Sequence, residues 1–403
     1  MSTFNPRRFA QIDVLRQLDQ DNLITFLTTY SGYLSGRGFS IAGNNGDGEL
    51  DLDKLAEILL QPTEGVDDDL VEALFLLHEL SDEDRFEELC KLADAVDVTV
   101  KPDSSPADVA LAIWLKDPMR LRRSHAEVLV LKPKSYFYFQ SEEDAPENFN
   151  LPDDNLLADI AAAMDVWFAS KKRGTGARVY AFDAPEENKI NFLIRHGMPF
   201  KREGKIENGK SSAVFYRPEF HDVIIYDRTS NELAIFNKSQ AKGERAMYVA
   251  VMGTKLFGDP DYFISRHKFT LDPLWDDGKD SLATADIEGI DEIKLTELQI
   301  QYPSPHNDFR IRRSDDFFAM LEAAGEGFPE DGDLHSAKFS VKFTGSKRPR
   351  TVSIAPFNKA NFDRNEDAPL IESWMLKRGF AFARHLDDGV EVTAGDEVVV
   401  GVE

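Results

Sequence analysis

The spacing of apolar residues changes once along the chain, near Pro118, and this change constrains the fold more than any single motif. Before Pro118 apolar side chains recur every three or four residues, as in the stretch DDDLVEALFLLHEL that begins at Asp67. That spacing places them on one face of a helix. After Pro118, short runs such as KSYFYFQ, HDVIIYD and KFSVKF are rich in aromatic and β-branched residues, which is typical of strands. The sequence therefore predicts an α+β protein, with a helical N-terminal domain followed by a mixed, mostly antiparallel α+β region.

The region after Pro118 mixes helices and strands without a long repetitive linker. The apolar spacing predicts a helix from Asp153 or Asp154 to about Lys172, a further helix over residues 184–197 and a strand over residues 125–133. Two basic turns distinguish the two parts of this region. The predicted organisation is an acidic helical domain over residues 1–118, an α+β subdomain with the first basic turn over 119–230, and an α+β subdomain with the second basic turn over 231–403.

Negative charge is concentrated in the helical part. The 403 residues include 47 Lys and Arg against 72 Asp and Glu, a formal net charge of −25. Residues 1–118 contain nine Lys or Arg and 24 Asp or Glu, and therefore account for −15 of that charge. Such a surface repels nucleic acid and anionic lipid over most of its area. A polyanion would have to meet a local basic patch.

Cysteine usage and hydropathy indicate the compartment. The chain has one cysteine, Cys90, so an internal disulfide is excluded and a reducing compartment is favoured. The N-terminal residues lack a continuous apolar stretch, and no later segment approaches the roughly 20 apolar residues that span a membrane. We expect a cytoplasmic protein without a membrane partner. The sequence predicts no metal site and no cofactor.

Compact basic clusters interrupt the acidic background after residue 118. If they converge on one face, they would form a positive stripe for nucleic acid despite the net charge, with the aromatic run 136–139 offering faces for base stacking. The clusters could equally pair with carboxylates of the acidic domain. The candidate nucleic-acid-binding residues are Arg120, Arg122, Arg123, Lys132, Lys134, Lys171, Lys172, Arg173, Arg178, Lys347, Arg348 and Arg350.

An enzymatic alternative comes from the strand HDVIIYD, a hairpin, and the strand ELAIF. Mg²⁺-dependent nuclease cores place carboxylates on two such strands to bind the metal, with a lysine that stabilises the developing charge. Phe236 occupies the place of the second carboxylate, so the pattern is incomplete and favours a protein that is not an enzyme. The alternative catalytic residues are Asp222, Asp227, Glu232 and Lys238.

The predicted function follows from these patterns. We expect a non-catalytic interaction or adaptor protein whose acidic helical domain docks a protein partner and whose basic turns contact nucleic acid. Two alternatives stay open. One is a divergent Mg²⁺-dependent nuclease or phosphohydrolase centred on the four residues named above. The other is an acidic adaptor, inhibitor or nucleic-acid mimic that binds a basic protein.

Overall fold

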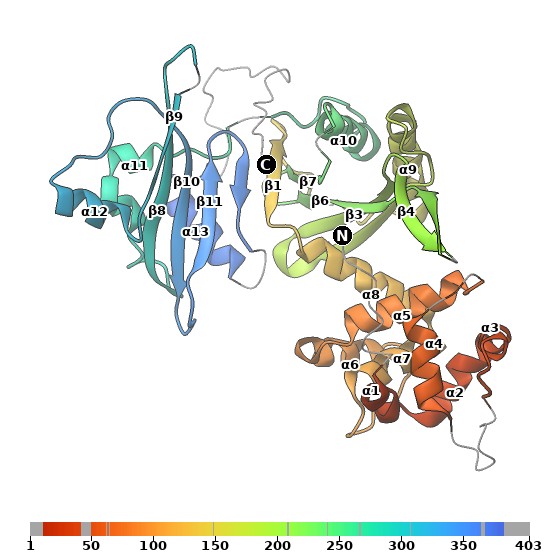
Figure 1. The fold of residues 1–403 in the computed structure, drawn as a ribbon. Coiled ribbons are helices and arrows are strands. Elements are labelled where there is room, and N and C mark those ends of the chain that lie inside the picture. Colours follow the sequence, from red (N-terminus) through yellow and green to blue (C-terminus); the bar gives the residue numbers. More distant parts are fainter. Residues whose placement is uncertain are drawn as a thin grey trace. The chain divides into compact units, whose positions relative to one another are not determined.

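The chain separates into two compact units, Met1–Val128 and Leu129–Glu403. The computed structural model describes residues 11–41, 50–61, 63, 65–147, 149–207, 209–239, 241–265, 267–306, 308–363 and 367–382. Helices make up the first unit, and a large sheet with covering helices makes up the second (Figure 1). Among the described residues, no helix is long and apolar enough to cross a membrane. The fold is therefore α+β, as the sequence predicts.

The first unit is a set of short helices around a leucine-rich core. Its elements are α1 (Ile12–Gln17), α2 (Gln20–Thr29), α3 (Ser31–Gly36), α4 (Leu52–Leu60), α5 (Asp68–Leu80), the 3₁₀ helix η2 (Glu83–Arg85), α6 (Phe86–Asp94), α7 (Pro106–Lys116) and most of α8 (Pro118–Leu131). Leu34, Leu55 and Leu77 are fully buried in the core. Side-chain caps set the helix starts: the Ser105 hydroxyl accepts a hydrogen bond from the Asp108 amide at 3.2 Å.

The second unit is built on a ten-stranded sheet in which every adjacent pair of strands is antiparallel. The strand order is β2-β3-β6-β7-β1-β12-β11-β10-β8-β9. The strands of this sheet are β1 (Ser135–Gln140), β2 (Arg178–Ala184), β3 (Lys189–Gly197), β6 (Glu219–Asp227), β7 (Glu232–Phe236), β8 (Ile290–Tyr302), β9 (Asp308–Arg313), β10 (Asp333–Phe343), β11 (Arg350–Ala355) and β12 (Lys359–Asn361). A separate ribbon consists of β4 (Lys201–Glu207) and β5 (Lys210–Tyr216).

Helices cover the sheet where apolar side chains alternate inward. The helix α9 (Asp154–Ser170) packs with α10 (Glu244–Met252) against Ile190, Phe192 and Ile194 of β3. The helix α13 (Ala368–Lys377) places Trp374 5.1 Å from Phe339 of β10, ring centre to ring centre. The remaining elements are the 3₁₀ helix η3 (Pro185–Glu187), the π-helix η4 (Gly253–Phe257), α11 (Pro273–Asp276), the 3₁₀ helix η5 (Gly278–Leu282) and α12 (Phe317–Ala324).

Two local predictions from the sequence are wrong. Residues 189–197 form strand β3 and not a helix, because Asn188 adopts a left-handed conformation (φ 54°) and the β-branched and aromatic residues that follow alternate between the two faces of the sheet. Residues 125–131 belong to helix α8 and not to a strand. There the buried residues are Leu121, Ala126 and Val130, a helical spacing that the apolar run VLVL obscures in the sequence.

A glycine next to β10 provides a test of this packing. Gly332 has a positive φ of 87°, and a Cβ at this position would lie 2.7 Å from Ile300 Cγ2 and 2.8 Å from the Gln301 carbonyl oxygen of β8. We predict that Gly332→Ala lowers the free energy of unfolding by about 1–3 kcal/mol, measured by denaturant titration. Gly327→Ala is the control because no atom lies within 4 Å of its Cβ position. Equal stability of the two variants would contradict the packing.

Candidate nucleic-acid interface

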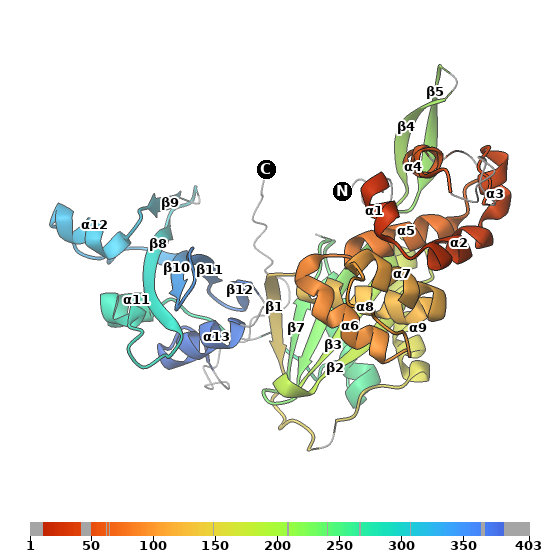
Figure 2. The ribbon, with the colours of Figure 1, turned by 90° about the horizontal axis from the view of Figure 1, so that it is seen from below.

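The β4–β5 ribbon is a two-stranded arm that extends away from the ten-stranded sheet (Figures 1 and 2). The ribbon is positively charged, whereas the protein as a whole is negative. Residues 198–217 contain five Lys or Arg against two Glu, in a chain of net charge −25. An isolated hairpin has no core of its own, so its side chains remain largely exposed. The ribbon therefore presents positive charge on a projecting element.

One face of the ribbon combines arginine with exposed apolar side chains. Arg202 pairs across the strands with Phe215, and Ile206 pairs with Ser211, so these side chains share a face. Phe215 is 66% exposed and Ile206 82% exposed. Phe200 and Arg217 continue the face at its base, with the Arg217 guanidinium 4.0 Å from the Phe200 ring centre. We call Phe200, Arg202, Ile206, Phe215 and Arg217 the aromatic face.

The opposite face and the tip of the ribbon carry lysines. Lys201 Nζ donates to the Glu203 carboxylate at 2.6 Å, and this hydrogen bond lowers the pKa of Glu203 below its ordinary value. Lys205 and Lys210 lie nearer the tip, and Lys210 is exposed. The acidic residue Glu203 is thus engaged by Lys201 and by Tyr216, which also hydrogen-bonds to it. The positive charge of Arg202, Lys205 and Lys210 dominates the outer part of the arm.

The base of the ribbon adjoins the first basic turn, residues 171–178. The Arg217 guanidinium donates to the Lys172 carbonyl oxygen. A Cβ at Gly197, where β3 ends, would lie 2.6 Å from the Arg173 carbonyl oxygen, so the turn and the ribbon approach each other closely only because residue 197 is glycine. Lys171 and Lys172 are exposed beside this base. The turn and the arm therefore form one basic region.

The glycines of this turn do not offer open amides to a phosphate. The Gly176 and Ala177 amides donate to the Asp165 carboxylate of α9 at 2.8 and 3.0 Å. An internal carboxylate thus occupies the position that an anion would take at a glycine-rich loop. Any polyanion that approaches this turn would meet its side chains rather than its backbone.

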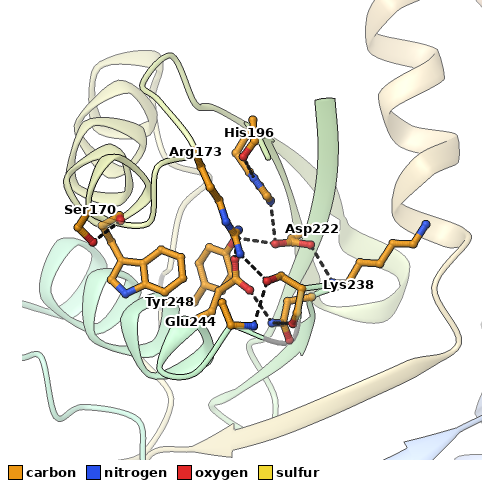
Figure 3. A network of polar contacts seen from close by, with 12 residues as sticks. Ser170, Arg173, His196, Asp222, Lys238, Glu244 and Tyr248 are labelled. Carbon is orange, nitrogen blue, oxygen red and sulfur yellow. Dashed lines mark hydrogen bonds and ion pairs between the residues drawn. The ribbon is translucent and has the colours of Figure 1, made fainter. Parts of the chain in front are cut away.

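A buried polar network lies beneath the basic turn (Figure 3). Arg173 is 3% exposed, and its guanidinium pairs with the Glu244 carboxylate and donates to the Ser239 hydroxyl. Glu244 also accepts a hydrogen bond from the Asn237 amide at 3.0 Å. A buried charge is tolerated when it is paired and hydrogen-bonded in this way. Arg173, predicted as a nucleic-acid contact, therefore joins α9, α10 and the end of β7 from inside the protein.

Asp222 is the second centre of the network. Its Oδ2 accepts a hydrogen bond from the Tyr248 hydroxyl at 2.7 Å and lies 3.0 Å from His196 Nε2, and its Oδ1 accepts from the Lys238 backbone amide at 3.1 Å. Burial alone would lower the pKa of His196, but the hydrogen bond and charge of Asp222 raise it above its ordinary value. Burial raises the pKa of Tyr248 well above its usual range. The Lys238 side chain points away from this centre (Figure 3).

The network contains a set of groups with the chemistry to ligate a metal ion. One ligand atom from each of His196, Asp222 and Glu244 lies within 4.8 Å of the others. Their donor atoms already bond to Arg173, Tyr248 and each other, and the Arg173 guanidinium supplies the positive charge that a cation would bring. The donor set therefore fits a self-contained network better than a metal site.

The other predicted basic residues are dispersed. Lys347 and Arg348 are exposed, whereas Arg350 of β11 pairs with Asp367. Five strands separate β2, which begins at Arg178, from β11 in the sheet order, so the two basic turns do not adjoin. Lys132 is exposed and Lys134 pairs with Asp363. Within the described part of the second unit, no single stripe joins the basic clusters.

The three arginines of α8 belong to the first unit. Arg122 pairs with Glu72 at 2.8 Å, and Arg123 lies 3.8 Å from Glu127. Arg120 is exposed. Two of these three cations are therefore engaged by carboxylates of their own unit.

The four residues of the nuclease alternative lie at two places. Asp222 and the Lys238 backbone belong to the buried network. Asp227 and Glu232 face each other at the opposite end of β6 and β7, about 17 Å along the strand from Asp222. The Asp227 carboxylate accepts hydrogen bonds from backbone amides of the hairpin turn. The Glu232 carboxylate accepts hydrogen bonds from Lys268 Nζ at 2.6 and 2.7 Å. The structure therefore does not bring the four side chains to one centre.

Sequence reasoning missed the ribbon as a candidate site. The missed cations are Lys201, Arg202, Lys205, Lys210 and Arg217. Part of the signal was present: Asn208-Gly209 is the strongest short hairpin sequence, and SAVFYR after it has strand-like composition, whereas KREGKIE before it does not. The five cations are spread over 17 residues, so they form no compact basic cluster in the sequence.

Comparison with known proteins gives no further assignment, since no family model matches this chain and no curated protein matches it.

The buried ion pair predicts a stability effect. Glu244→Gln removes one charge and leaves the Arg173 guanidinium buried without its counter-charge, which should lower the free energy of unfolding by about 3–5 kcal/mol. The control is Glu87→Gln, because Glu87 forms an exposed pair with Lys91 on α6, and we expect a change below about 0.5 kcal/mol. Denaturant unfolding measures both. A small, equal effect of the two substitutions would show that the network does not stabilise the fold.

The surroundings of two histidines predict opposite shifts in their titration. The pKa of His196 is raised above 6.5 by Asp222, whereas burial lowers the pKa of His335 below 6.5. A raised folded-state pKa stabilises the protein below about pH 6.5, and this contribution is lost as the pH rises through the raised value. NMR titration should place His196 above His335. His196→Asn should lose more stability relative to the parent at pH 6 than at pH 9, and the reverse order would refute the interaction.

Proposed function

We propose that this protein is a non-catalytic interaction protein that binds nucleic acid through the β4–β5 ribbon and the adjoining first basic turn. One observation carries the proposal: a projecting arm of five cations and two Glu stands on a protein of net charge −25. A phosphate backbone is repelled by most of this surface and attracted to the arm. The ribbon would therefore set where a polyanion binds.

The aromatic face favours single-stranded nucleic acid over duplex. Unstacked bases can stack on the exposed rings of Phe200 and Phe215, and arginine planes beside them add cation–π contacts. Ile206, near the tip, offers a further apolar contact. Such stacking contributes about 1–3 kcal/mol per base and is tolerant of sequence. We therefore expect broad sequence tolerance and strong salt dependence.

The helical unit has a separate part in the proposal. Its first 118 residues carry −15, which disfavours nucleic acid and suits a protein partner with a basic surface. We propose that this unit docks such a partner while the ribbon contacts nucleic acid. A full-length variant whose ribbon no longer binds nucleic acid should still bind the basic partner, and a joint loss would contradict separate roles.

The first test exchanges charge on the ribbon. We predict that Arg202→Glu/Lys210→Glu weakens binding of a single-stranded oligonucleotide at least about tenfold and lowers the salt slope by about 0.7 for each phosphate that the variant no longer neutralises. Fluorescence polarisation over a range of salt measures both quantities. The matched control is Lys347→Glu/Arg348→Glu, which makes the same charge change at exposed positions of the second basic turn.

Comparing the two double variants distinguishes binding at the ribbon from binding through the overall charge of the protein. Equal weakening by the two double variants would attribute binding to overall charge and contradict the ribbon site. Absence of binding by the parent would contradict the function itself. Phe215→Ala should lower affinity by about 1–3 kcal/mol without changing the salt slope, because it removes a stacking face and no charge.

A further inference from the structure

A cavity of about 290 Å³ lies in the second unit, away from the ribbon. It is on the face of β1, β6 and β7 opposite to the one that α9 and α10 cover, and it is bordered by α13. Five aromatic side chains contribute to its wall: Tyr136, Tyr138, Phe269, Phe362 and Phe382. A concave space of this size with aromatic walls and a few polar groups is typical of a small-molecule site.

Charged groups line the cavity unevenly. Three acidic residues line it, Asp227, Glu232 and Glu372, against two lysines, Lys189 and Lys268. Lys268 Nζ is held by Glu232, which is only 4% exposed. Lys189 interacts electrostatically with Glu372 of the lining and lies 3.1 Å from Glu187, which is outside the lining. The polar lining therefore carries net negative charge and is rich in hydrogen-bond acceptors.

A buried ion pair between Glu232 and Lys268 forms part of the cavity wall. Burial raises the pKa of Glu232, although the charge of Lys268 opposes this shift. Burial alone would lower the pKa of Lys268, but the charge of Glu232 raises it above its ordinary value.

We infer that this cavity binds a small planar aromatic molecule that carries an amino group. The ring would pack between the aromatic walls, and the amino group would donate to the acidic lining, in which carboxylates outnumber ammonium groups by one. A ligand of the same shape with a carboxylate or phosphate would meet net negative charge and bind more weakly. The site requires no contact with the ribbon, so its ligand is independent of nucleic-acid binding.

The test compares two probes of similar shape and opposite charge on the full chain. Tryptamine should bind, and indole-3-acetate should bind at least about tenfold more weakly, as measured by calorimetric titration. Failure of tryptamine to bind would overturn the site, and equal affinity of the two probes would overturn the charge selectivity. Both results are independent of oligonucleotide binding.

Variants locate the binding. Ala234→Leu fills part of the cavity from β7 and should abolish tryptamine binding, whereas Ala213→Leu on the ribbon should not change it. Leu376→Trp, on the exposed side of α13, is the second cavity variant in case Ala234→Leu fails to fold. Circular dichroism checks the fold of each. Unchanged affinity in a folded cavity variant would contradict the assignment.

Discussion

The buried ion pair between Arg173 and Glu244 is the constraint on which the arrangement of the ribbon depends. It joins the turn after α9 to the first residue of α10, and neither charge can be exposed to water without breaking that junction. His196 and Asp222 extend the network to β3 and β6. Because β3 ends one residue after His196 and leads into the ribbon, the network determines where the arm leaves the sheet.

Rigid support and exposed charge are thus separated within one region. Arg173 is the cation that pairs with Glu244 inside the protein, and it is inaccessible to solvent. The ribbon cations, Lys171 and Lys172 face outward. A binding element on a supported base loses less conformational freedom on binding than one on an unstructured loop. The negative charge of the other surfaces repels a polyanion, so it restricts binding to the basic region.

Much of the fold could be predicted from local sequence patterns, but the candidate sites could not. Apolar spacing predicted α9, and alternation predicted β1, β6 and β10. The helix predicted over residues 184–197 is wrong. Acidic residues before an apolar run and basic residues after it favour a helix through its dipole, but the same order of residues also occurs in strands. Only the pairing of these residues with β2 and β6 decides between the two structures. Clustering in sequence also does not measure exposure: Arg173 looks like its neighbours but is buried by a partner 71 residues away. The ribbon cations become a candidate binding site only because their hairpin lies outside the ten-stranded sheet.

Hydrogen–deuterium exchange with and without a saturating single-stranded oligonucleotide tests the central claim most directly. A ribbon that stands outside the sheet has few protecting contacts, so its amides should exchange rapidly in the free protein. The account predicts that residues 201–216 become slower to exchange when the oligonucleotide binds, while residues of β8–β11 stay unchanged. Protection confined to β8–β11, with the ribbon unaffected, would contradict it.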